Sequence, residues 1–132
     1  MATFNSTITG SNTGDTLLGT EASQYINAGT GNDSISSTFS LSSILANAGN
    51  DTIGAVGAST TVYGGSGSDS FYFVDDLSNV LLAGNQDNDT VQIFAGATAS
   101  SIWGGSGDDS IKIGGDADAT AELDLIVADY RL

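Results

Sequence analysis

Six aspartates recur at nearly constant spacing along this 132-residue chain, and a row of carboxylates is a set of ligands that hard metal cations prefer. The steps between them are 18 residues three times and then 20 residues twice. A period of about 20 residues is typical of a solenoid, in which each repeat forms one coil stacked on the next. The pattern therefore predicts one acid per coil on a shared edge: Asp15, Asp33, Asp51, Asp69, Asp89 and Asp109.

Such a row of acids needs a counter-charge. Stacked coils lie about 4.8 Å apart, and neighbouring carboxylates at that distance repel by roughly 3 kcal/mol at an effective dielectric near 20. Several such pairs rival the stability of a small domain. Calcium accepts six to eight oxygen ligands, whereas magnesium prefers a smaller octahedral shell and keeps its waters. We therefore expect Ca²⁺ as the cofactor, bound along this edge.

Two rows of apolar residues explain how a coil is built. Each aspartate is followed two residues later by an apolar residue, such as Ile35, and another stands seven residues before it, such as Ile26. The two rows fit short strands in two facing parallel sheets, because strand side chains alternate between faces. The sequence predicts an all-β, two-sheet β-solenoid of about six to seven coils with 18–20 residues per coil. We expect the two extra residues of the later coils to lengthen a strand and widen the solenoid.

The opposite edge is predicted to lack the acidic row. Nine residues from each aspartate, the matching position is never acidic and reads Ser6, Gln24, Ser42, Thr60, Val80 and Ser100. Calcium is therefore expected on one edge only.

Composition excludes several functions. The formal net charge is −14, with 16 acids against Lys112 and Arg131, so nucleic acid and anionic membrane surfaces are not expected partners. No apolar run is long enough to span a bilayer, and no N-terminal signal peptide is visible. There is no His and no Cys, and the aspartates already have a role, so we do not expect an enzyme.

Two stretches resemble a known calcium-binding unit. Residues 64–72 read GGSGSDSFY and residues 104–112 read GGSGDDSIK, and both match the nonapeptide of repeats-in-toxin (RTX, hemolysin-type) proteins at every defined position. Residues 28–35, AGTGNDSI, miss only the first glycine. Elsewhere Asn47, Asn85 and Asp87 replace glycines, and Thr13 stands where glycine is expected. The resemblance covers roughly residues 8 to 113.

The RTX resemblance implies a parallel β-roll. In that family calcium lies between neighbouring turns and is held by the aspartates and by backbone carbonyls of the glycine-rich positions. With one edge occupied, roughly three to five ions are implied. Besides the six aspartates, the implied metal-binding residues are Gly29, Gly31, Gly49, Gly64, Gly65, Gly67, Asp87, Gly104, Gly105, Gly107 and Asp108.

The leading functional hypothesis is a secreted structural protein at a cell or particle surface. Because the roll occupies residues 1–120, self-association end to end into filaments or a surface layer is expected. Family members commonly leave the cell by type I secretion, and residues 121–132 are interpreted as a cap on the roll, a secretion signal, or both. A detached piece of a larger toxin or enzyme remains a further hypothesis.

The alternative function is a binding module, such as an adhesin fragment or an ice- or glycan-binding roll. Tyr63 and Trp103 share one register position and should face outward, where aromatic rings can stack on the sugars of a surface glycan. Unconnected surface aromatics are the competing interpretation.

Overall fold

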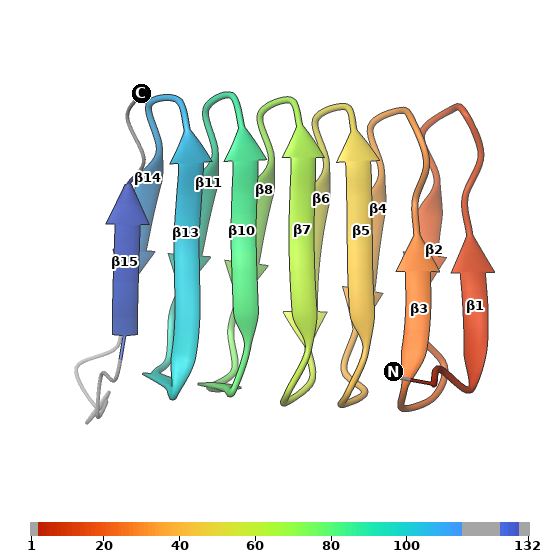
Figure 1. Cartoon of the computed structure of the whole chain (residues 1–132), viewed down its shortest axis with the longest axis horizontal. Coiled ribbons are helices and arrows are strands. Elements are labelled where there is room, and N and C mark those ends of the chain that lie inside the picture. Colours follow the sequence, from red (N-terminus) through yellow and green to blue (C-terminus); the bar gives the residue numbers. More distant parts are fainter. Residues whose placement is uncertain (1–2, 115–124, 130–132) are drawn as a thin grey trace.

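The computed structural model describes residues 3–114 and 125–129, which form a β-solenoid of about six turns with two main sheets facing each other (Figure 1). This architecture confirms the predicted all-β roll. All strand pairs are parallel, and each strand pairs with its counterparts one coil away. The described residues contain no helix that could span a lipid bilayer.

The first sheet contains seven strands in the order β1-β3-β5-β7-β10-β13-β15. The strand bounds are β1 (Ser6–Thr9), β3 (Gln24–Asn27), β5 (Ser43–Ala48), β7 (Thr61–Ser66), β10 (Leu81–Gln86), β13 (Ser100–Ser106) and β15 (Leu125–Asp129).

The second sheet contains six strands in the order β14-β11-β8-β6-β4-β2. Its strand bounds are β2 (Thr16–Leu18), β4 (Ser34–Ser37), β6 (Thr52–Val56), β8 (Ser70–Phe73), β11 (Thr90–Ile93) and β14 (Ser110–Ile113).

The core consists of the two predicted apolar rows, and each residue stacks on its equivalent in the next coil. In the first sheet Ile26 pairs with Ile44, and Ile44 pairs with Val62. In the second sheet Ile35 pairs with Ile53, which pairs with Phe71. These side chains are almost fully buried. Because the sheet period is two, this register places every aspartate on the same edge.

The sequence predicted that the two extra residues of the later coils lengthen a strand. This prediction is wrong, because they do not lengthen a main strand. Strand β8 of a 20-residue coil has four residues, and so does β4 of an 18-residue coil. The insertion instead lies in the turn opposite the aspartates, where β9 (Leu77–Ser78) and β12 (Ala97–Thr98) form a third, two-stranded sheet. Leu77 and Ala97 are buried there, so the added residues extend the core through the turn.

The opposite edge lacks the acidic row, as predicted, but it is not free of acids. Its register positions from Gln24 to Ser100 are buried and uncharged. Exposed Glu21, Asp75 and Asp76 lie in the turns between the sheets. Oδ1 of Asp76 accepts a 2.7 Å hydrogen bond from the N–H of Gly96, so this acid joins two of the enlarged turns.

Only part of the C-terminal segment can be placed. Strand β15 pairs in parallel with β13 and extends the first sheet. Residues 115–124 and 130–132 lie outside the described residues. The proposed division into residues 1–120 and 121–132 therefore remains a prediction.

Candidate metal-binding edge

The six aspartates form a ladder in which the later five carboxylates each accept a hydrogen bond from the backbone of the preceding coil. Oδ1 of Asp33 accepts a hydrogen bond from the N–H of Asp15 at 2.7 Å. Oδ1 of Asp109 does the same for the N–H of Asp89 at 2.9 Å. The three bonds between them are Asp33 N–H to Asp51 Oδ1, Asp51 N–H to Asp69 Oδ1 and Asp69 N–H to Asp89 Oδ1, at 2.7–2.9 Å.

The second carboxylate oxygen of five rungs is buried and has no hydrogen-bond partner among the described residues. A buried acceptor without a donor is costly, and an ionised one more so. Five such atoms in one column are therefore too many to be accidental, and they indicate that a positively charged group belongs beside them. The atoms are Oδ2 of Asp33, Asp51, Asp69, Asp89 and Asp109.

Asp15 differs from the other five rungs. Its Oδ2 accepts a 2.6 Å hydrogen bond from the N–H of Ser11 and a 2.8 Å bond from the Ser11 hydroxyl. The first turn also lacks the left-handed backbone of the other turns, since neither Ser11 nor Thr13 has a positive φ. Protein donors thus already satisfy the outer oxygen of Asp15, and the structure does not group it with the unpartnered oxygens.

Left-handed residues shape the acidic turns. The positions four and two residues before each of the later five aspartates have positive φ, a region that glycine enters without strain. Asn47, Asn85 and Asp87 occupy three of these positions, with φ of 81°, 89° and 73°. Asn and Asp tolerate this region better than other non-glycine residues. The departures from the nonapeptide therefore preserve the turn. The glycines at these positions are Gly29, Gly31, Gly49, Gly65, Gly67, Gly105 and Gly107.

A different glycine leaves space for the unpartnered oxygen. At Gly64, an added Cβ would meet Oδ2 of Asp69 and the carbonyl oxygen of Gly84 in the next coil. Gly84 faces Oδ2 of Asp89 in the same way. Two oxygens from separate groups thus lie beside the same glycine and leave no room for a side chain there. Gly104 faces Oδ2 of Asp109.

Gly84 was not predicted as a site residue, because the altered residues around it obscured the nonapeptide. The first glycine is replaced in two other coils, where Ala28 and Ala46 take its place. Both alanines are fully buried. The carboxylate therefore packs directly against a glycine in the coils of Asp69, Asp89 and Asp109, whereas the coils of Asp33 and Asp51 have an alanine at that position.

A second ladder lies outside the aspartates and was not anticipated. Oδ1 of Asn32 accepts from the N–H of Asn50 at 2.9 Å, and Oδ1 of Asn50 accepts from the N–H of Ser68 at 3.0 Å. Oδ1 of Asn88 accepts from the N–H of Asp108 at 2.8 Å. These amides reach toward the following coil, whereas the aspartates reach toward the preceding one. Asn in three of the six positions just before the aspartate was the available sequence signal.

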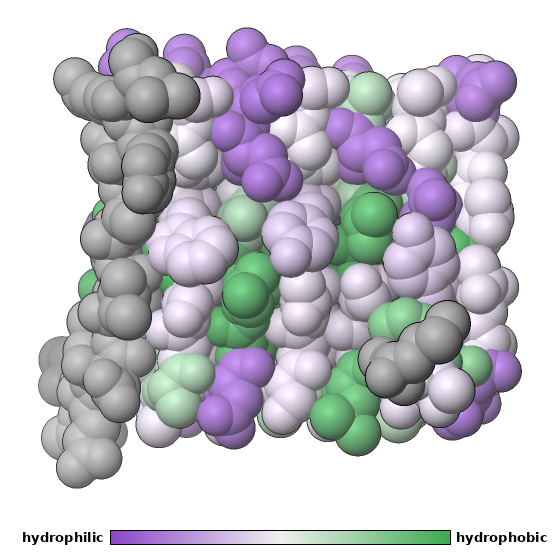
Figure 2. Space-filling view, in the orientation of Figure 1, coloured by the Kyte–Doolittle hydropathy of each residue, from purple (hydrophilic) through white to green (hydrophobic). Residues whose placement is uncertain are grey.

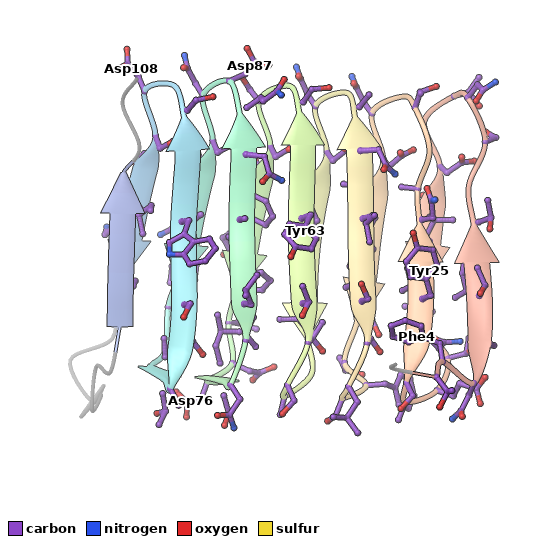
Figure 3. The ribbon with its side chains drawn as sticks, in the orientation of Figure 1. Phe4, Tyr25, Tyr63, Asp76, Asp87 and Asp108 are labelled. Carbon is purple, nitrogen blue, oxygen red and sulfur yellow. The ribbon has the colours of Figure 1, made fainter. Side chains whose placement is uncertain are left out.

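The two extra acids of the predicted site lie at its outer rim. Asp87 and Asp108 are exposed at the tips of the acidic turns (Figure 3). Oδ2 of Asp87 accepts a 3.0 Å hydrogen bond from the N–H of Gly67, one coil earlier. Neither belongs to the buried column, so we place them as electrostatic neighbours of it.

Burial makes the central carboxylates hard to ionise in the metal-free chain. Desolvation is the main cause that raises the pKa of Asp69 to about 6 and the pKa of Asp89 to about 7. Repulsion from neighbouring aspartates raises both pKa values further, while the ladder hydrogen bond opposes the shift. Desolvation also raises the pKa of Asp51.

The donor set fits a hard cation only if the backbone contributes. Within the described residues, no group of three or more acidic side chains gathers closely enough to hold an ion by itself. One carboxylate per coil and the carbonyl oxygens of glycine turns offer oxygen ligands only, which is the preference of calcium. The unpartnered Oδ2 atoms are oxygen ligands of this kind.

Comparison with protein families agrees with the geometry. The model of the RTX calcium-binding nonapeptide repeat matches residues 9–38, 58–73 and 84–119 in four copies, which together span more than half of the chain. Searches of curated proteins and of solved structures return no match. The matched segments contain five of the six rungs and leave out the turn before Asp51, where Ala46 and Asn47 replace glycines. The chain belongs to the RTX calcium-binding nonapeptide repeat family, as a calcium-binding β-roll.

Proposed function

We propose that this chain is a structural protein whose roll becomes stable when calcium neutralises the aspartate ladder. The observation that carries the proposal is the column of five buried Oδ2 atoms without hydrogen-bond partners. A cation bound to the folded chain alone stabilises it by mass action, and here it would also remove the cost of burying the carboxylates.

The proposed ligands follow from the turn geometry. The buried Oδ2 atoms supply the charge, and carbonyl oxygens of the glycine-rich turns complete the shell. Sites in the coils of Asp69, Asp89 and Asp109 should bind most tightly, because Gly64, Gly84 and Gly104 let Oδ2 approach the backbone without a methyl group between them. Asp15 should bind least, because Ser11 already donates to its Oδ2.

Calcium titration tests this function. Far-ultraviolet circular dichroism of the chelated protein should show a largely unfolded chain, and added Ca²⁺ should restore the β spectrum. Mg²⁺ at the same concentration should have a much smaller effect, because its octahedral shell keeps water. A full β spectrum in excess chelator, unchanged by Ca²⁺, would refute the proposal.

The family match supports an extracellular setting as part of this proposal. Export to a calcium-rich exterior would let the roll fold only after it leaves the cell. The role there is proposed to be structural rather than enzymatic, because the acids serve the ladder. Detection of the protein outside intact cells tests the location. A comparison in the presence of a chelator and after its removal tests whether the exported chain folds only with Ca²⁺.

Self-association is a further part of this proposal. In the described part of the chain, β1 and β2 are edge strands of their sheets, and β14 ends the second sheet. Edge strands carry backbone groups that can pair with another chain. Electron microscopy should show filaments or sheets in Ca²⁺ and none in chelator. Monodisperse monomers in both conditions would exclude assembly.

A further inference from the structure

The outer face of the first sheet carries aromatic rings at regular intervals. Tyr63 on β7 and Trp103 on β13 both pair with Ala83 of β10, which lies between them. The two rings are therefore two strand spacings apart, about 9.6 Å. They are 38% and 39% exposed, whereas Ala83 is only 4% exposed. A small residue thus separates two rings on the same row.

The same face has a second aromatic feature near the N-terminus. The segment before β1 places Phe4 against Tyr25 of β3, with ring centroids 5.7 Å apart. Phe4, Tyr25 and Tyr63 all lie on the face seen in Figure 3. Aromatic residues therefore occur on β3, β7 and β13, which alternate with β5 and β10 in the sheet.

A groove of about 560 Å³ on this face is lined by two of the rings, Phe4 and Tyr63. Phe4, Leu41 and Tyr63 contribute its apolar walls, and hydroxyl groups of Ser43, Ser59 and Thr61 line the rest. This volume lies in the range of small-ligand sites, and a mixture of apolar walls with a few polar groups is their usual lining.

The face is uncharged in a strongly acidic chain. The two outward rows of the sheet run from Thr7 to Ser101 and from Thr9 to Trp103, and neither includes an acid or a base. Figure 2 shows the middle of this face as mostly pale and green, with purple side chains mainly toward its two edges. An acidic polymer would be repelled by a chain with net charge −14, whereas a neutral one would not.

We propose that this face binds a neutral polysaccharide that runs across the strands, parallel to the axis of the roll. The apolar faces of pyranose rings would stack on Phe4, Tyr63 and Trp103, while serine and threonine hydroxyls bind the sugar hydroxyls. The spacing between Tyr63 and Trp103 is about that of alternate rings in an extended chain of linked pyranoses. The proposal deepens the binding-module alternative and requires only a folded roll, not a particular set of calcium ligands.

Trp103 is the only tryptophan in the chain, so its fluorescence reports on the site directly. We would titrate the folded protein in Ca²⁺ with three neutral hexasaccharides: cellohexaose, chitohexaose and mannohexaose. At least one should shift or quench the emission with saturation. Oligogalacturonate, which is acidic, should have no effect. Circular dichroism on the same samples establishes that the roll is folded, so a failure of calcium-driven folding is recognised separately.

Two variants complete the test. Tyr63→Ala should weaken binding of the active sugar about tenfold, as loss of an aromatic contact at the centre of a site typically does. Tyr72→Ala is the matched control, because Tyr72 is half-exposed on the opposite sheet. It should bind the sugar with unchanged affinity.

Four results would overturn the proposal. They are no saturable change with any neutral hexasaccharide, equal affinity in Tyr63→Ala, tighter binding of oligogalacturonate, and a Trp103 shift that depends on protein concentration alone. The last result would instead assign this face to contact between copies of the chain.

Discussion

The backbone N–H of Asp69 donates a 2.9 Å hydrogen bond to Oδ1 of Asp89, twenty residues further along the chain. The other oxygen of Asp89 has no partner within the described residues. One carboxylate thus has two roles. Oδ1 joins two coils through its hydrogen bond, and Oδ2 is available to a cation. This division explains why the same residue both builds the edge and makes it unstable when metal is absent.

Asp69→Asn should separate these two roles. The amide oxygen can still accept the N–H of Asp51, while the buried charge is removed. Without metal the variant should be more stable by about 1–3 kcal/mol at neutral pH, because burial no longer opposes ionisation. Its stabilisation by Ca²⁺ should be smaller than that of the parent chain. The folded fraction in chelator, from circular dichroism, measures the first effect, and urea denaturation in Ca²⁺ measures the second.

Asp75→Asn is the matched control for that substitution, because Asp75 is an exposed acid in a turn on the opposite edge. It should change neither the stability of the metal-free chain nor the stabilisation by Ca²⁺ appreciably. Similar calcium responses in the two variants would mean that general charge reduction, rather than the ladder, controls folding.

The metal-free roll should become less stable as pH rises. The folded-state pKa values of Asp69 and Asp89, about 6 and about 7, exceed the ordinary value of 3.8. The folded chain therefore binds protons that the unfolded chain has released, and its stability falls between about pH 4 and about pH 7. With saturating Ca²⁺ the trend should reverse, because the metal requires ionised carboxylates. The β signal in chelator and the urea midpoint in Ca²⁺, each at about pH 5 and about pH 7.5, give the two slopes; slopes of the same sign would contradict this prediction.

Replacing glycine by alanine should cost much more stability in an acidic turn than in a strand. Gly65 has a φ of 119°, and an added Cβ would collide with the carbonyl of Asn47. We expect Gly65→Ala to destabilise the calcium-bound roll by about 1–3 kcal/mol. Gly54→Ala is the control, because its Cβ would meet only the carbonyl oxygen of Tyr72, at 3.6 Å. Thermal unfolding should show little loss for the control, and equal losses would argue against a conformational requirement at Gly65.

Thr60→Val should stabilise the opposite edge. The Thr60 hydroxyl is buried without a hydrogen-bond partner, and the equivalent position in the next coil is Val80. Removing an unsatisfied buried hydroxyl should raise the free energy of unfolding by about 1 kcal/mol. Thr61→Val, at a neighbouring outward position, should have almost no effect. A loss of stability in Thr60→Val would indicate that its hydroxyl makes a contact in solution.

The sequence was sufficient for the coil architecture, because a side-chain period of two and a coil of 18 or 20 residues permit few arrangements of Ile26, Ile35 and their equivalents. The aspartate edge followed from the same register. The site of the two-residue insertion did not, because a longer strand and a longer turn both preserve facing. Only the burial of Leu77 and Ala97 distinguishes the two.

Three features of the candidate sites were out of reach of the sequence pattern. The bond from each aspartate to the preceding coil depends on the offset between coils, which spacing does not determine. The outer amides at Asn32, Asn50 and Asn88 occupy a position that the nonapeptide leaves undefined. The groove beside Tyr63 forms because the segment containing Phe4 packs across the sheet, and that contact has no periodic signature.

The aspartate ladder gives the molecule a polarity. Because every carboxylate reaches back toward the coil before it, a coil acquires its side-chain acceptor only when its successor has been added. A chain that emerges from a narrow exit with its N-terminus first would therefore add one coil at a time, and the aspartate of each new coil would bind the backbone of the coil before it. A chain that emerges with its C-terminus first would supply each carboxylate before the backbone N–H that donates to it.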